Sequence, residues 1–199
     1  MKVKLARLLY EAGCVKIGDF TLSSGLRSPI YINLKSLPSH PRAFKCVVRM
    51  LVAAIRNRGF DAVCGLALGG VPLATAVAYE MGKPLLYVRK QEKGHGLRTL
   101  IEGEPRDGIE AVLVDDVATT GGTLARGVRV LREHGIQVKE AIVVVDRLQG
   151  AGETLRDLGV RLSSLITLPQ LVEALHSEGL LPPCHYERLK SYLRGLTHV

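Results

Sequence analysis

Short apolar runs recur along the chain, and amphipathic segments with helical spacing separate them. Short apolar runs indicate buried strands, whereas apolar residues spaced by three and four positions indicate helices with one buried face. These patterns predict strands at residues 20–22, 30–34, 62–66, 84–88, 111–114, 138–145 and 161–166. They predict helices at residues 3–12, 41–58, 72–81, 124–134 and 153–158, and two more within the stretch 169–199.

This alternation of strands and helices predicts an α/β fold, with a central, mostly parallel sheet flanked by helices. The carboxyl ends of parallel strands lie at one edge of such a sheet, and α/β proteins bind their ligands there. Polar residues that directly follow the predicted strands are therefore candidates for binding.

The most informative of these strand ends is the stretch 112–123, which reads VLVDDVATTGGT. The apolar strand is followed by Asp115 and Asp116, by the small and hydroxyl residues 119–123, and then by a helical pattern. Backbone N–H groups at a helix N-terminus attract phosphate, and glycine lets an anion approach closely. The two carboxylates would repel phosphate, so they suit sugar hydroxyls or a hydrated divalent cation.

The composition is that of an ordinary globular domain. The 199 residues are 47% hydrophobic and 23% charged, and no apolar run reaches the ~18 residues of a membrane span. The N-terminal segment lacks the apolar core and the cleavage site of a signal peptide. The four cysteines are scattered without a CxxC pair, which favours the reducing cytoplasm.

The net charge of +8 makes nucleic-acid binding a class to consider. The basic residues are dispersed, and no basic motif interleaved with aromatic residues is present, so we expect no nucleic-acid partner. A small polyanionic substrate accounts for part of the excess, because basic residues near a site raise the local concentration of an anion.

Two further segments carry candidate residues. Residues 89–108 read RKQEKGHGLRTLIEGEPRDG, and a polar loop of ~20 residues inside a domain is usually functional. Arg147 follows the predicted strand 138–145, and its planar guanidinium suits a carboxylate. The alternatives are a basic surface hairpin for the first segment and a local Asp146–Arg147 surface pair for the second.

The stretch 112–123 resembles the loop that binds 5-phosphoribosyl 1-pyrophosphate (PRPP) in type I phosphoribosyltransferases. Neither GxxxxGK[ST] nor GxGxxG after a strand is present, which argues against P-loop and dinucleotide-binding proteins. Ala118 stands where many members carry a larger apolar residue. Three more phrases narrow the resemblance to orotate phosphoribosyltransferases: GDFTLSSGLRSPIYINLK resembles their N-terminal hood, RKQEKGHG their mobile catalytic loop, and VVVDRLQG the segment whose arginine binds the orotate carboxylate.

The resemblance implies the type I phosphoribosyltransferase fold with a small N-terminal hood. It implies transfer of ribose 5-phosphate from PRPP to orotate, giving orotidine 5′-phosphate and pyrophosphate in de novo pyrimidine (UMP) biosynthesis. We expect one domain, with the hood in residues 1–40, the PRPP-binding core in 41–168 and C-terminal helices in 169–199. The resemblance also implies a homodimer whose mobile loop serves the neighbouring active site, and Mg²⁺ bound mainly through PRPP and water.

Carried over residue by residue, the resemblance assigns catalysis to Lys93, His95, Asp115 and Asp116. The expected PRPP-binding residues are Gly69, Gly70, Arg89, Lys90, Lys93, His95, Asp115, Asp116, Val117, Ala118, Thr119, Thr120, Gly121, Gly122 and Thr123. Arg89, Lys93 and His95 would neutralise the charge of the departing pyrophosphate. Orotate would contact Thr119 and Arg147.

Two lysines of some family members are absent from this chain. Ser23 stands where a lysine precedes the SG of the hood, and Leu68-Gly69 stands where some relatives have Tyr-Lys. Arg27 could partly replace the first lysine, and backbone amides would take over from the second.

Two other functions remain open. A purine phosphoribosyltransferase would share the PRPP loop, and a phosphoribosyltransferase-like transcription regulator could keep that loop as a PRPP sensor. The hood, mobile-loop and Arg147 phrases weigh against the purine enzyme. Lys93, His95 and the lack of an added helix-turn-helix segment weigh against the regulator.

Overall fold

The computed structural model describes residues 1–21, 25, 27–90 and 100–196. The helices are α1 (Lys2–Glu11), α2 (Pro41–Ile55), α3 (Gly70–Met81), α4 (Gly122–Glu133), α5 (Ala151–Arg156), α6 (Leu168–Ser177) and α7 (Pro183–Leu196), with a 3-10 helix, η1, at Leu34–Ser39. The strands are β1 (Val15–Thr21), β2 (Arg27–Ile32), β3 (Ala62–Leu66), β4 (Leu85–Val88), β5 (Ile101–Glu102), β6 (Glu110–Ala118), β7 (Gln137–Asp146) and β8 (Arg161–Thr167).

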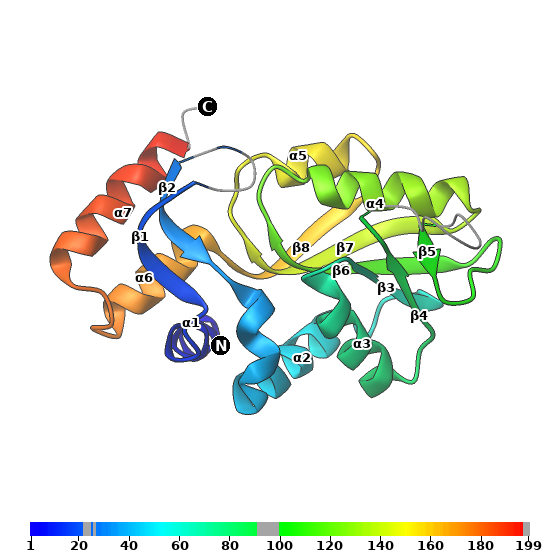
Figure 1. The fold of residues 1–199 in the computed structure, drawn as a ribbon, viewed down its shortest axis with the longest axis horizontal. Coiled ribbons are helices and arrows are strands. Elements are labelled where there is room, and N and C mark those ends of the chain that lie inside the picture. The colour runs from blue at the N-terminus through cyan, green and yellow to red at the C-terminus, as the bar shows by residue number, and fades with distance from the viewer. Residues whose placement is uncertain (22–24, 26, 91–99, 197–199) are drawn as a thin grey trace.

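The larger sheet has the strand order β5-β4-β3-β6-β7-β8. All neighbouring pairs in it are parallel except β4 and β5, which are antiparallel. Helices α2 and α3 cover one face, and α4 and α5 cover the other (Figure 1). The predicted α/β fold with a mostly parallel central sheet is therefore confirmed.

The two faces of the sheet build two apolar cores, because successive side chains of a strand point to opposite faces. On β6, Val112 and Val114 pack into the core on the α2–α3 side, while Ala111 and Leu113 pack into the core on the α4–α5 side. A strand buried on both faces reads as a continuous apolar run rather than an alternating one. That is why the sequence pattern located β6 and β7 so clearly.

The smaller sheet is the antiparallel pair β1–β2, which forms the hood. It stands at one end of the molecule, with α1, α6 and α7 beside it (Figure 1). The two predicted hood strands are confirmed, although they are longer than predicted because pairing runs from Val15↔Ile32 to Thr21↔Arg27. The second strand was predicted to end at residue 34, but β2 ends at Ile32, and Leu34 begins the 3-10 helix η1.

Several element boundaries differ from prediction for local physical reasons. Strand β6 continues through Asp115 and Asp116 to Ala118, because β7 keeps pairing with it as far as Ala118↔Asp146. On its other side β3 stops pairing at Gly65↔Val114, so the two acids lie just past the end of β3. The predicted loop 89–108 contains the short strand β5, which pairs with β4.

Within the described part of the chain, no helix combines the length and apolar character that crossing a bilayer requires. The division into hood, core and C-terminal helices as parts of one domain stays a prediction.

Candidate active site

Two adjoining cavities lie at the carboxyl edge of the parallel strands. The first has a volume of about 310 Å³ and receives residues from the hood, η1, the loop after β3, the end of β6 and Arg147 after β7. The second, of about 360 Å³, is lined by Asp115 and by residues of the stretch 117–124. Asp115, Val117, Thr119 and Thr123 line both cavities. The strand ends that were predicted to meet at one edge do so.

The two carboxylates are held at the floor of this site by their own backbone. The Asp116 amide donates to Asp115 Oδ1 at 2.9 Å, and the Val117 amide donates to Asp116 Oδ1 at 2.8 Å. Asp115 is only 6% exposed, and burial together with the Asp116 charge holds its pKa well above the ordinary value. The nearby Lys35 opposes that rise. Burial therefore disfavours the ionised form of Asp115.

The segment 119–123 presents backbone amides to the second cavity. Helix α4 begins at Gly122, and no side chain of a described residue caps its N-terminus. Gly121 has a φ of 84° and lies so close to α5 that an added Cβ would come within 3.0 Å of the Ala151 Cα. Only glycine suits that conformation and that approach. Uncapped amides and the positive end of a helix dipole suit a phosphate. The binding of phosphate by residues 119–123 stays a prediction.

Gly69, in the loop after β3, lies directly against the Asp116 carboxylate. A Cβ added at Gly69 would lie 2.3 Å from Asp116 Oδ2 and 2.5 Å from its carboxyl carbon. A side chain there would displace the acid. Gly69 lines the first cavity, and Gly70 is buried as the first residue of α3. The loop and the acid pair are therefore packed directly against each other.

Arg147 is the most unusual residue of the site, since its side chain is large, charged and only 2% exposed. Its guanidinium donates to neutral acceptors, and among the described residues it forms no ion pair. The alternative of a surface pair with Asp146 is wrong, because Asp146 Oδ1 instead accepts from the Leu148 amide at 2.9 Å. A buried cation without a counter-ion is costly, so the site is prepared for an anion.

Comparison with known proteins agrees with this geometry. The sequence-family model described as the phosphoribosyl transferase domain matches residues 33–161 of this chain. The orotate phosphoribosyltransferase of Pyrococcus abyssi is 44% identical over 176 residues, which cover 87% of this chain and 97% of that protein. The chain belongs to the orotate phosphoribosyltransferases.

Two solved structures extend the likeness to three dimensions. Leishmania donovani UMP synthase aligns with 98% of this chain at a TM-score of 0.89 and 33% identity, although the chain spans only 42% of that longer protein. The Mycobacterium tuberculosis orotate phosphoribosyltransferase in complex with PRPP aligns with 85% of this chain and 98% of its own, at a TM-score of 0.70 and 30% identity. These relatives favour the orotate enzyme over the purine enzyme and the regulator.

The basic residues of the segment 89–108 differ in whether they line the first cavity. Lys90 lines the first cavity. Arg89 sits beside it, but its guanidinium pairs with Glu102 of β5 at 3.2 Å. Lys93 and His95 lie outside the described residues. Their catalytic role, like that of Arg89 at the pyrophosphate, stays a prediction.

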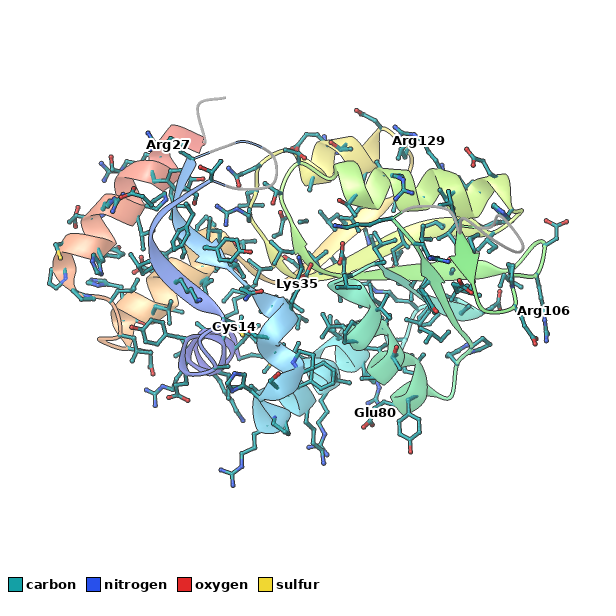
Figure 2. The ribbon with its side chains drawn as sticks, in the orientation of Figure 1. Cys14, Arg27, Lys35, Glu80, Arg106 and Arg129 are labelled. Atoms are coloured by element: carbon teal, nitrogen blue, oxygen red, sulfur yellow. The ribbon has the colours of Figure 1, made fainter. Side chains whose placement is uncertain are left out.

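Lys35 is a cavity-lining residue that the sequence analysis missed. It is the last residue of the hood phrase and lies on η1, and Figure 2 places it centrally, where the hood faces the large sheet. Arg27, which was considered as the replacement for the absent hood lysine, lies at the outer tip of β2 and does not line the first cavity (Figure 2). A lysine directly after a predicted strand was the available signal for Lys35.

Proposed function

We propose that this chain catalyses the transfer of ribose 5-phosphate from PRPP to orotate, giving orotidine 5′-phosphate and pyrophosphate, as a step of de novo pyrimidine biosynthesis. The observation that carries the choice of orotate is Arg147, a buried cation without an acidic partner among the described residues, facing the cavity that holds the acid pair. Orotate carries a carboxylate, which a guanidinium binds through short, charge-assisted hydrogen bonds. Adenine, hypoxanthine and uracil lack that carboxylate.

Different residues of the site bind different parts of PRPP. Amides of residues 119–123 bind the 5-phosphate, with the Thr119 and Thr123 side chains at the junction of the two cavities. Asp115 and Asp116 hold the ribose hydroxyls. The wall of the first cavity includes Gly69 and Val117, that of the second includes Ala118, and Gly70 packs against Asp115. Lys90 supplies positive charge to the first cavity.

The reaction forms a bond between the anomeric carbon and a ring nitrogen of orotate while the bond to the pyrophosphate oxygen breaks. The proton of that ring nitrogen leaves with the pyrophosphate. The transition state resembles an oxocarbenium ion, so positive charge grows on the ribose and negative charge grows on the leaving group. The acid pair lies on the ribose side, and we assign Arg89, Lys93 and His95 to the pyrophosphate side. Thr119 and Arg147 hold orotate in line, which lowers the entropic part of the barrier.

Mg²⁺ is the cofactor that the PRPP chemistry implies. Among the described residues no three His, Cys, Asp or Glu side chains gather into a metal site. One or two carboxylates together with substrate phosphates and water suit Mg²⁺ well, so Asp115 and Asp116 fit as its protein neighbours. Bound there, the ion would neutralise charge on the pyrophosphate.

We further propose that the enzyme is a cytoplasmic homodimer with shared active sites, acting on PRPP and orotate as its partners. The cysteines that bear on location, Cys14, Cys46, Cys64 and Cys184, are free thiols in the described chain. Free thiols suit a reducing compartment.

The test is consumption of orotate, followed by ultraviolet absorbance, with PRPP and Mg²⁺, and with adenine, hypoxanthine and uracil in parallel. Only orotate should react. Arg147→Lys keeps the charge but loses the planar fork, so the KM for orotate should rise by about tenfold or more while the KM for PRPP changes little. Arg156→Lys, at an exposed position on α5, is the matched control.

Turnover of a purine base in place of orotate would overturn the proposal. Binding of PRPP without turnover of any base would instead support the regulator.

A further inference from the structure

The guanidinium of Arg147 is fixed by residues from three separate parts of the chain. Its Nε donates to Gln149 Oε1 at 2.8 Å, and its Nη2 donates to Ser28 Oγ on β2 at 2.9 Å and to the Tyr192 hydroxyl on α7 at 3.5 Å. Among the described residues, Nη1 reaches only the Ile30 carbonyl, at a long 3.5 Å. The end of the guanidinium that carries Nη1 is therefore its least satisfied part.

Tyr192 completes a closed ring of hydrogen bonds. Its hydroxyl accepts from Gln149 Nε2 at 3.2 Å as well as from Arg147, and Gln149 accepts from Arg147 in turn. Tyr192 does not line the first cavity, so it acts on a bound ligand only through Arg147 and Gln149. Helix α7 runs alongside the hood strand β2, and this brings the hydroxyl to the ring (Figure 1).

A free arginine side chain samples many rotamers, and immobilising it on binding costs conformational entropy. A ring that holds the side chain before the ligand arrives removes that cost from binding. The contacts at Nε and Nη2 leave the Nη1 end for a carboxylate. The residues that set the direction of this end are Gln149, Ser28 and Tyr192.

We propose that Tyr192 is a positioning residue, carried by the C-terminal helix, that aims Arg147 at the carboxylate of the pyrimidine. This inference rests on the proposed function, in which Arg147 binds orotate. It gives α7 a part in substrate selection, although the helix supplies no residue to the cavity wall described above. It predicts that the Tyr192 hydroxyl matters for ligands with a carboxylate and not for ligands without one.

The test compares the binding of two nucleotides by isothermal titration calorimetry. Orotidine 5′-phosphate carries the carboxylate, and UMP is the same nucleotide without it. In Tyr192→Phe the ring and its packing stay and only the hydroxyl is lost. We expect the affinity for orotidine 5′-phosphate to fall about 3- to 10-fold and the affinity for UMP to stay unchanged. In kinetics the KM for orotate should rise and the KM for PRPP should not.

Tyr186→Phe is the matched control, since it removes a hydroxyl from the same helix. The Tyr186 hydroxyl donates to Glu173 at 2.8 Å, and its ring stacks on His176, away from the cavity. This variant should bind both nucleotides like the wild-type protein.

The outcomes separate the inference from the function on which it rests. A wild-type protein that binds both nucleotides equally would overturn the proposed role of Arg147 itself. A wild-type preference for orotidine 5′-phosphate that persists fully in Tyr192→Phe would overturn the inference alone. Equal losses of affinity for both nucleotides would mean that Tyr192 only stabilises the fold, and would also overturn the inference.

Discussion

Burial disfavours the ionised form of Asp115. The side chain lies at the floor of the site beside Asp116, and both effects raise its pKa. An acid whose pKa is raised by folding holds its proton more tightly in the native protein than in the unfolded chain. Its contribution to stability is therefore present at low pH and is lost as the pH rises through the folded-state pKa. At neutral pH the ligand-free protein is therefore less stable than it would be with a side chain at position 115 that cannot ionise.

Asp115→Asn should stabilise the empty protein while it removes most of the activity. The amide oxygen can still accept from the Asp116 backbone, and the amide cannot ionise. The gain in the free energy of unfolding should be on the order of 1 kcal/mol near neutral pH and should shrink as the pH is lowered toward 4. Urea denaturation at several pH values measures it.

Asp157→Asn, at an exposed position after α5, is the control and should show neither the gain nor its pH dependence. A loss of stability in Asp115→Asn at neutral pH would contradict the argument.

At the scale of elements, helix α4 serves two parts of the site at once. Its N-terminus offers amides to the second cavity, and Arg126 in its second turn holds the chain that leaves β4. Arg126 Nη2 donates to the Lys90 carbonyl at 2.7 Å and to the Arg89 carbonyl at 3.2 Å. Because Lys90 lines the first cavity, this contact fixes the start of the segment 89–108 relative to the N-terminus of α4.

Arg126→Met should therefore weaken the use of PRPP more than that of orotate. The methionine keeps most of the packing but cannot hold the two carbonyls, and hydrogen bonds from a charged donor are worth about 1.5–3 kcal/mol. We expect the KM for PRPP to rise about 3- to 30-fold in steady-state kinetics.

Arg129→Met on the same helix is the control, because Arg129 is exposed (Figure 2). If the two variants behave alike, the contact has no role in the site.

At the scale of the whole molecule, the family resemblance implies that each active site is completed by a second subunit. Lys93 and His95 are assigned to the segment that would cross to the partner, whereas Arg147 belongs to the core of its own subunit. A dimer in which one subunit lacks Lys93 and the other lacks Arg147 therefore retains one intact site.

Mixing inactive Lys93→Ala with inactive Arg147→Ala should restore activity once the subunits exchange. A random mixture gives about half heterodimers with one intact site each, so we expect about a quarter of the wild-type turnover. Native mass spectrometry checks that the heterodimers form. Heterodimers without activity would mean that the segment serves its own subunit.

The sequence alone determined the order of the core elements and the chemistry of the strand ends. Residues 111–114 of β6 and 141–145 of β7 are continuous apolar runs, and the DDVATTGGT phrase directly follows the first of them. Such features are local: a few adjacent residues specify a buried strand, a glycine turn and a helix start. Because parallel strands end at one edge, locating the strands also located Asp115, residues 119–123 and Arg147 at a common site.

Only the tertiary structure decided which residues complete that site. Arg147 contacts Ser28, 119 positions away, and Tyr192, 45 positions away, and no spacing rule links such residues. Lys35 enters the cavity because the hood stands over the sheet edge. Gly69 comes close to Asp116 because the loop after β3 packs against the end of β6. These contacts depend on how separate elements pack in space, and local periodicity carries no information about that packing.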